Sequence, residues 1–148
     1  MKGHETSCYT VGIEIAVGAE RAFQYLSDLE KLGLWALGCF DTKPSGKEGL
    51  YKGRSLFDGS EVFVRTETDE GRLLIDYYVG GPERQIPRIF TRVVPGHTYG
   101  GGPDHCLVIM TAWRTKDMSD PRWRRLCASH DAEILMIQSQ LERQSPCP

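Results

Sequence analysis

The first regular pattern in the chain is an alternation of hydrophobic with small or polar residues over residues 9–17, YTVGIEIAV. Successive side chains of a strand point to opposite faces, so an alternation of this kind predicts a half-buried strand. Its hydrophobic face carries Tyr9, Val11, Ile13, Ile15 and Val17.

A helical spacing follows in GAERAFQYLSDLEKLGLWALG, residues 18–38. Ala22, Phe23, Leu26 and Leu29 recur at intervals of three to four, which places them on one helical face. Gly33 then interrupts the pattern before a short apolar turn. We therefore predict two short helices with a break near Gly33.

Residues 40–115 contain apolar, β-branched segments separated by turn signals. The segments are residues 50–57, 62–68, 72–79, 88–94 and 106–115. Short connections without intervening helices favour antiparallel pairing of consecutive strands, because parallel neighbours need long crossovers. The pattern therefore predicts a meander.

A long amphipathic helix is predicted near the C-terminus. Ser119 or Asp120 is a suitable N-cap, and Pro121 is tolerated at the first helical position. The pattern continues to about Glu142. The expected fold is α+β: a curved antiparallel sheet of about seven strands, with two short helices after the first strand and the long helix packed on the sheet.

His130 lies in the middle of the apolar arc of this helix. At about 100° per residue, its neighbours on the wheel are Trp123, Leu126, Cys127, Ile134, Ile137 and Leu141. A buried imidazole needs hydrogen-bond partners. One interpretation is a core histidine bonded to Tyr77, Tyr78 or a backbone carbonyl. The other is a polar group in a ligand cavity that orients a carbonyl or hydroxyl, or moves a proton.

The register of two strands decides which other side chains face the helix. Tyr77 shares a strand face with Leu73, Ile75 and Val79, so we predict that Tyr77 points inward and Tyr78 outward. In residues 88–94 the favoured register places Ile89, Thr91 and Val93 inside. The opposite register would place Arg88 and Arg92 in the cavity, as anchors for a carboxylate or phosphate.

Composition fits one globular domain over residues 1–148, with residues 1–7 and 144–148 as flexible tails. The chain is 40% hydrophobic and 26% charged, and its net charge of -2 gives no reason to expect nucleic-acid binding. The five cysteines have no spacing typical of zinc sites or redox pairs, so free thiols in a reducing compartment are expected. Without an apolar leader or span, we expect a cytoplasmic protein that does not insert into membranes.

Other candidate sites are weak. The glycine-rich residues 95–105 lack the ending of a phosphate-binding loop, and no ordered set of metal ligands or serine-nucleophile signature is present. No metal or cofactor is therefore expected. Residues 106–115 are apolar on both faces, and Leu135 and Met136 fall outside the apolar arc of the long helix. These features make a homodimer a further expectation.

The order of elements resembles the START-like, or helix-grip, superfamily, which includes polyketide cyclases/dehydrases, lipid-transport proteins and birch pollen allergens. The matching segments are IEIAVGAERAFQYLSDLEKLGLW at 13–35, LIDYYVGGP at 74–82, IFTRVVPG at 89–96 and QLE at 140–142. The resemblance covers nearly the whole chain and implies a sheet that curls around the C-terminal helix and encloses a cavity for an apolar ligand.

The expected function is binding of a small hydrophobic or lipid-like ligand between the sheet and the long helix. Candidate cavity residues are Trp35, Ile75, Tyr77, Thr91, Trp113, Trp123, Cys127, His130 and Ile134. The first alternative is an enzyme similar to polyketide cyclases and aromatases, with His130 and Tyr77 as the groups that steer an aldol-type or dehydration step. The second alternative is a protein-interaction module.

Overall fold

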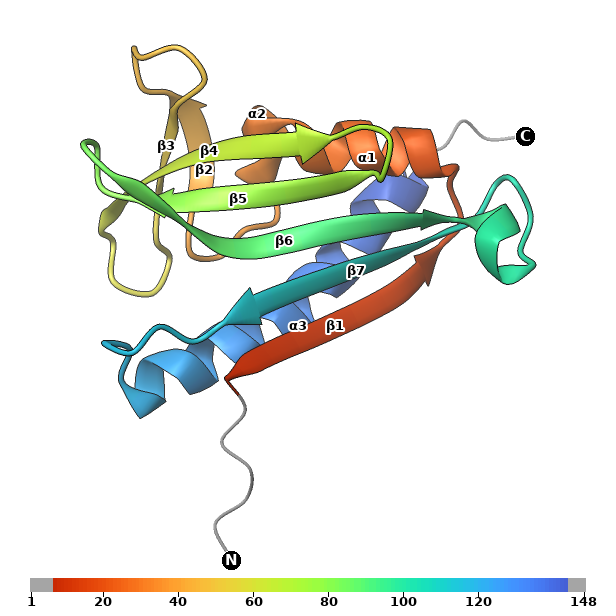
Figure 1. The fold of residues 1–148 in the computed structure, drawn as a ribbon. Coiled ribbons are helices and arrows are strands. Elements are labelled where there is room, and N and C mark those ends of the chain that lie inside the picture. The colour runs from red at the N-terminus through yellow and green to blue at the C-terminus, as the bar shows by residue number, and fades with distance from the viewer. Residues whose placement is uncertain (1–6, 144–148) are drawn as a thin grey trace, which may run out of the picture.

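A computed structural model describes residues 7–143 of the chain. Its centre is one antiparallel sheet of seven strands that curves around a long helix (Figure 1). The strands are β1 (Cys8–Ile15), β2 (Phe40–Pro44), β3 (Tyr51–Arg54), β4 (Glu61–Asp69), β5 (Leu74–Gly80), β6 (Gln85–Pro95) and β7 (Cys106–Trp113). The α+β architecture agrees with the prediction from the sequence.

Strands β2 to β7 form the predicted meander, and the first strand closes it. The order across the sheet is β1-β7-β6-β5-β4-β3-β2, and β1 pairs with β7 along its whole length. Strand β2 lies within residues that the sequence assigned to a turn, which is an error of the prediction. One aspartate, one lysine and a terminal proline gave this edge strand no apolar alternation.

Two short helices follow β1, namely α1 (Ala19–Ser27) and α2 (Leu29–Leu32). The break between them lies at Asp28, whereas the sequence predicted it near Gly33. The Asp28 carboxylate accepts hydrogen bonds from the backbone N–H groups of Glu30 and Lys31, which caps the new helix. Gly33 instead ends α2 against β2, where its N–H donates to Thr42 Oγ1 over 3.0 Å.

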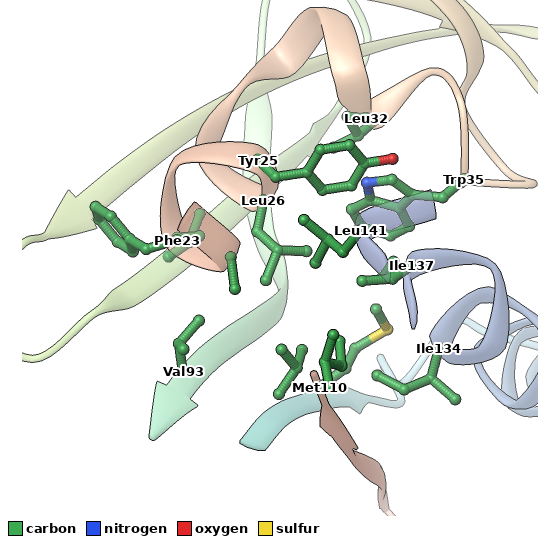
Figure 2. Packing of buried hydrophobic residues seen from close by; sticks show 14 of the residues in the cluster. Phe23, Tyr25, Leu26, Leu32, Trp35, Val93, Met110, Ile134, Ile137 and Leu141 are labelled. Carbon is green, nitrogen blue, oxygen red and sulfur yellow. The ribbon is translucent and has the colours of Figure 1, made fainter. Parts of the chain in front are cut away.

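The long helix α3 spans Asp120–Arg143. Ser119 Oγ accepts from the N–H of Arg122 over 3.3 Å, so Ser119 is the cap of the helix. The C-terminal half of α3 carries Ile134, Ile137 and Leu141 into the hydrophobic core. Figure 2 shows these side chains facing Leu26 of α1 and Met110 of β7.

The outer faces of β7 and α3 are less exposed than their sequences suggested. On β7 the even-numbered residues are buried, and Leu107, Ile109 and Trp113 are half-buried on the opposite face. Leu135 of α3 is exposed, whereas Met136 packs partly against the core. The homodimer therefore stays a prediction.

The sequence predicted flexible chain ends and no insertion into membranes. The tails predicted at residues 1–7 and 144–148 lie, apart from residue 7, outside the described residues. Within residues 7–143, no helix combines the length and apolar character needed to cross a membrane.

Candidate functional site

A cavity of about 560 Å³ lies between the sheet and the N-terminal half of α3. The helix contributes a stripe at helical spacing that runs from Arg122 to Glu133. Strands β4, β5 and β6 form the facing wall, and the segment after α2 and the β3–β4 loop close the sides. The cavity exists because the apolar residues of α3 that fill the core, Ile134, Ile137 and Leu141, belong to its C-terminal half.

His130 and Glu133 form a buried pair on this stripe. His130 Nδ1 lies 2.8 Å from Glu133 Oε1, and the two residues are 3% and 4% exposed. The other carboxylate oxygen, Glu133 Oε2, accepts from the backbone N–H of Leu37 over 2.8 Å. Because a carboxylate accepts, Nδ1 carries the proton, and the carboxylate fixes the tautomer and orientation of the ring.

The second ring nitrogen of His130 is left for another partner. Nε2 is buried and has no hydrogen-bond partner within residues 7–143. An unpaired buried polar atom costs about 1 to 3 kcal/mol, so the fold alone does not explain this nitrogen. The partners that the sequence suggested for a core histidine, Tyr77, Tyr78 and a backbone carbonyl, are wrong, since the observed partner is Glu133.

A β-bulge on β6 brings Arg88 to the cavity. Tyr77 pairs with Ile89 but Tyr78 pairs with Pro87, so Arg88 is the extra residue on β6. An extra residue breaks the alternation of faces and can redirect a side chain. Arg88 and Ile89 therefore both line the cavity, while Thr91 and Val93 are buried.

The two registers considered from the sequence are each correct for part of β6. Thr91 and Val93 face inward as favoured, and Arg92 is exposed. The expectation that Arg88 lies outside is wrong, because the bulge turns its side chain towards the cavity. Its Nε is buried without a hydrogen-bond partner in the described part of the chain.

Two further arginines come from the first turns of α3. The guanidinium of Arg125 lies 4.6 Å from the centre of the Phe57 ring, on the loop between β3 and β4. Arg122 also lines the cavity and is exposed, which places it at the opening. Burial lowers the pKa of Arg88, and the positive charge of Arg122 lowers it further.

Tyr77 and Trp35 form part of the inner wall. The Tyr77 hydroxyl donates to the backbone oxygen of Leu26 over 2.6 Å and lies 3.4 Å from Thr91 Oγ1. Burial raises the pKa of Tyr77 far above its ordinary value, so the hydroxyl stays protonated. Trp35 meets the Tyr77 ring edge to face, with the ring centres 6.1 Å apart.

Of the nine candidate residues named from the sequence, Trp35, Tyr77 and His130 line the cavity. The other six lie elsewhere. Ile75 and Ile134 are in the core, and Thr91 is buried behind Tyr77. Trp113 is half-buried beside Phe90, Trp123 is buried, and Cys127 is half-buried.

The sequence interpretation missed Glu133, which is the partner of the central histidine. A residue three positions after His130 lies one turn further along the same helix face, within reach of the ring. That spacing was a usable signal. The contribution of Arg122 and Arg125 had no such signal, because both lie on the charged, exposed part of the helix surface.

Metal chemistry has no obvious set of ligands here. Within residues 7–143, no group of three or more histidine, cysteine, aspartate or glutamate side chains is arranged to hold a metal ion. The titratable groups that line the cavity are three carboxylates, three arginines, one histidine, one tyrosine and one cysteine.

No family model matches the sequence, and no curated protein matches it significantly. Solved structures match over most of the chain. A START superfamily protein from Mycobacterium smegmatis has a TM-score of 0.67 and 13% identity, over 93% of this chain and 99% of that one. The Zhui aromatase/cyclase from Streptomyces sp. R1128 has a TM-score of 0.68 and 12% identity, over 95% and 96%.

A third similar structure is the Aha1 dimer from Colwellia psychrerythraea, with a TM-score of 0.66 and 16% identity over 95% of this chain and 100% of that one. Similarity at these identities shows the fold. The chain has the START-like, helix-grip fold that the sequence resemblance implied.

Proposed function

We propose that this protein binds a small, largely apolar ligand in the cavity between the sheet and α3. A volume of about 560 Å³ lies inside the range of about 300 to 1,000 Å³ that is usual for sites of this kind. Val64, Val79, Ile89 and Leu126 supply apolar surface, and a few polar groups would fix the orientation of the ligand.

The observation that carries this proposal is the unpaired Nε2 of His130. With Nδ1–H bound to Glu133, Nε2 of an uncharged ring would be a hydrogen-bond acceptor. A ligand hydroxyl that donates to Nε2 would remove the cost of the unpaired nitrogen. The ligand class is therefore an apolar molecule with at least one hydroxyl or enol group.

Native mass spectrometry of the purified protein, followed by extraction and identification of bound small molecules, tests the proposal. We expect a stoichiometric adduct that is lost on denaturation. In His130→Asn the shorter amide can still donate to Glu133 but cannot replace Nε2. This variant should fold normally and bind the extracted compound about tenfold or more weakly. Equal affinity in wild type and variant would remove His130 from the site.

Catalysis similar to that of an aromatase/cyclase is the second candidate, because the His130–Glu133 pair is arranged like a general base and its orienting carboxylate. Nε2 would take a proton from a carbon between two carbonyl groups. The resulting enolate would attack a further carbonyl carbon of the substrate and form a C–C bond. The alkoxide formed there would take the proton back from His130 before water is lost. Tyr77 and His130 line the same cavity but are not hydrogen-bonded to each other, so Tyr77 would act as a wall residue.

Deuterium exchange at the central carbon of a β-diketone, followed by NMR, separates the two candidates. A catalyst should accelerate exchange in wild type and lose the acceleration in His130→Asn, whereas a carrier should leave the exchange rate unchanged. A protein-interaction module is the remaining alternative, and the open cavity is the feature that favours ligand binding over it. The homodimer and the cytoplasmic location remain expectations.

A further inference from the structure

We propose that the ligand carries a carboxylate, which Arg88 binds through its guanidinium fork with Arg122 completing the site at the cavity opening. This inference rests on the proposed ligand-binding function and adds the chemical class of the ligand to it. It predicts an amphipathic monoanion, with its apolar part enclosed by the sheet and α3.

The position of Arg88 suits contact with a ligand in the cavity better than a bond within the protein. In a regular strand, alternation from Thr91 would turn the Arg88 side chain outward. The bulge on β6, opposite Tyr77 and Tyr78, brings it to the cavity wall instead. Its Nε is buried and has no hydrogen-bond partner in residues 7–143. Over the same residues, Arg88 forms no ion pair within 4.0 Å, unlike Arg65 and Arg114.

The surroundings of Arg88 leave its charge incompletely compensated. Burial lowers its pKa, and the nearby charge of Arg122 acts in the same direction. The negative charge of Asp117 raises the pKa of Arg88 and so opposes both effects. The positive charges of Arg88 and Arg122 in turn lower the pKa of Asp117. A partly buried guanidinium is costly without an acidic partner, so an anion from outside the chain would be stabilised there.

The balance of charges favours a monoanion. The cavity wall contains three carboxylates, Asp58, Glu61 and Glu133, against three arginines, Arg88, Arg122 and Arg125. The charge of Arg125 already acts on Asp58, whose pKa it lowers, and Glu133 is bonded to His130. A dianionic phosphate would therefore meet too little free positive charge, while one carboxylate matches the two donors that a guanidinium presents side by side.

A competition experiment with matched amphiphiles tests this inference. N-phenyl-1-naphthylamine, a neutral fluorescent probe, reports occupation of the cavity. Dodecanoate, 1-dodecanol and dodecyl phosphate then compete for it at concentrations below micelle formation. The variants are Arg88→Met, which keeps side-chain length without charge, and Arg92→Met as a control, because Arg92 is an exposed arginine on the same strand.

We expect dodecanoate to displace the probe about ten- to hundredfold better than dodecanol in wild type, since charge-assisted hydrogen bonds are among the strongest polar contacts. Arg88→Met should remove this preference, with each displacement referred to the Kd of the probe measured in the same variant. Arg92→Met should keep the preference. If Arg88→Met fails to fold, as judged by thermal unfolding, Arg122→Met provides the second test and should reduce the preference.

Three results would overturn the inference. Equal displacement by dodecanoate and dodecanol, or a preference that persists in both Arg88→Met and Arg122→Met, would show that no carboxylate site exists while the probe still binds. Stronger displacement by dodecyl phosphate would replace the carboxylate by a phosphate. Failure of the probe and all three amphiphiles to bind would instead remove the ligand-binding function on which the inference rests.

Discussion

Nδ1 of His130 lies 2.8 Å from Oε1 of Glu133, and this pair fixes a buried polar group in the wall of the cavity. Glu133 is held in turn by the N–H of Leu37, from the segment after α2. The pair thus links α3 to the segment after α2, at the side of the cavity. It also leaves Nε2 as the ring atom able to bond a ligand.

Glu133→Gln should destabilise the protein. An amide has one acceptor where the carboxylate uses two, so either His130 Nδ1–H or Leu37 N–H loses its partner. We expect the free energy of unfolding to fall by about 1 to 3 kcal/mol, measured by urea denaturation. Glu48→Gln, at an exposed loop position, is the control and should change it by less than about 0.5 kcal/mol. Equal effects would contradict a structural role for the pair.

Tyr77→Phe and Tyr78→Phe test the orientation of β5. The Tyr77 hydroxyl is buried and satisfies the backbone oxygen of Leu26, whereas that of Tyr78 bonds Glu67 at the exposed face. Loss of the buried bond should cost about 1 to 2 kcal/mol of unfolding free energy, and loss of the exposed one about 0 to 0.5 kcal/mol. Chemical denaturation of both variants gives the comparison, and a larger effect at Tyr78 would refute the assigned faces.

The thiols of Cys39 and Cys8 should differ sharply in reactivity. Burial raises the pKa of Cys39 to about 12, so at pH 8 only about one molecule in ten thousand carries the reactive thiolate. The thiolate fraction of Cys39 rises with pH and reaches one half at that pKa. Cys8 is exposed and should be alkylated by iodoacetamide at pH 8 while Cys39 is spared, as measured by peptide mass spectrometry. Rapid labelling of Cys39 in the native protein would show that the cavity wall around it opens.

Gly33→Ala should damage the contact between α2 and β2. A Cβ at Gly33 would lie 2.2 Å from the backbone nitrogen of Thr42, whereas one at Gly38 would meet nothing within 4 Å. We expect Gly33→Ala to lower the unfolding free energy by about 1 to 3 kcal/mol, and Gly38→Ala to leave it nearly unchanged. Thermal unfolding of the two variants checks this, and equal stability would mean that the contact is not rigid.

The sequence predicted the fold well because its periodicities are strong. The alternation predicted over residues 9–17 corresponds to β1 (Cys8–Ile15), and the predicted helical stripe corresponds to α3, since burial on one face constrains both patterns. The break at Asp28 was missed because an aspartate that begins one helix also ends the one before it, and Gly33 was the more conspicuous signal.

The cavity was predicted less well, for identifiable physical reasons. The wheel identified His130 correctly as inward-facing but could not show that the first half of α3 stands away from the sheet. A bulge has no periodic signature, so the position of Arg88 could not be read from alternation. Trp113 and Trp123 were expected in the cavity because they are large and apolar, and these properties suit other buried positions equally well.

The central claim, that the cavity under α3 binds an apolar ligand, is tested most directly by one fluorescence titration with N-phenyl-1-naphthylamine. Val79→Trp fills the cavity from β5, and Val94→Trp adds the same side chain on the opposite face of the sheet. We predict saturable binding to wild type and Val94→Trp, and a Kd raised about tenfold or more in Val79→Trp. Absence of binding to wild type, or the same Kd in Val79→Trp, would contradict the claim.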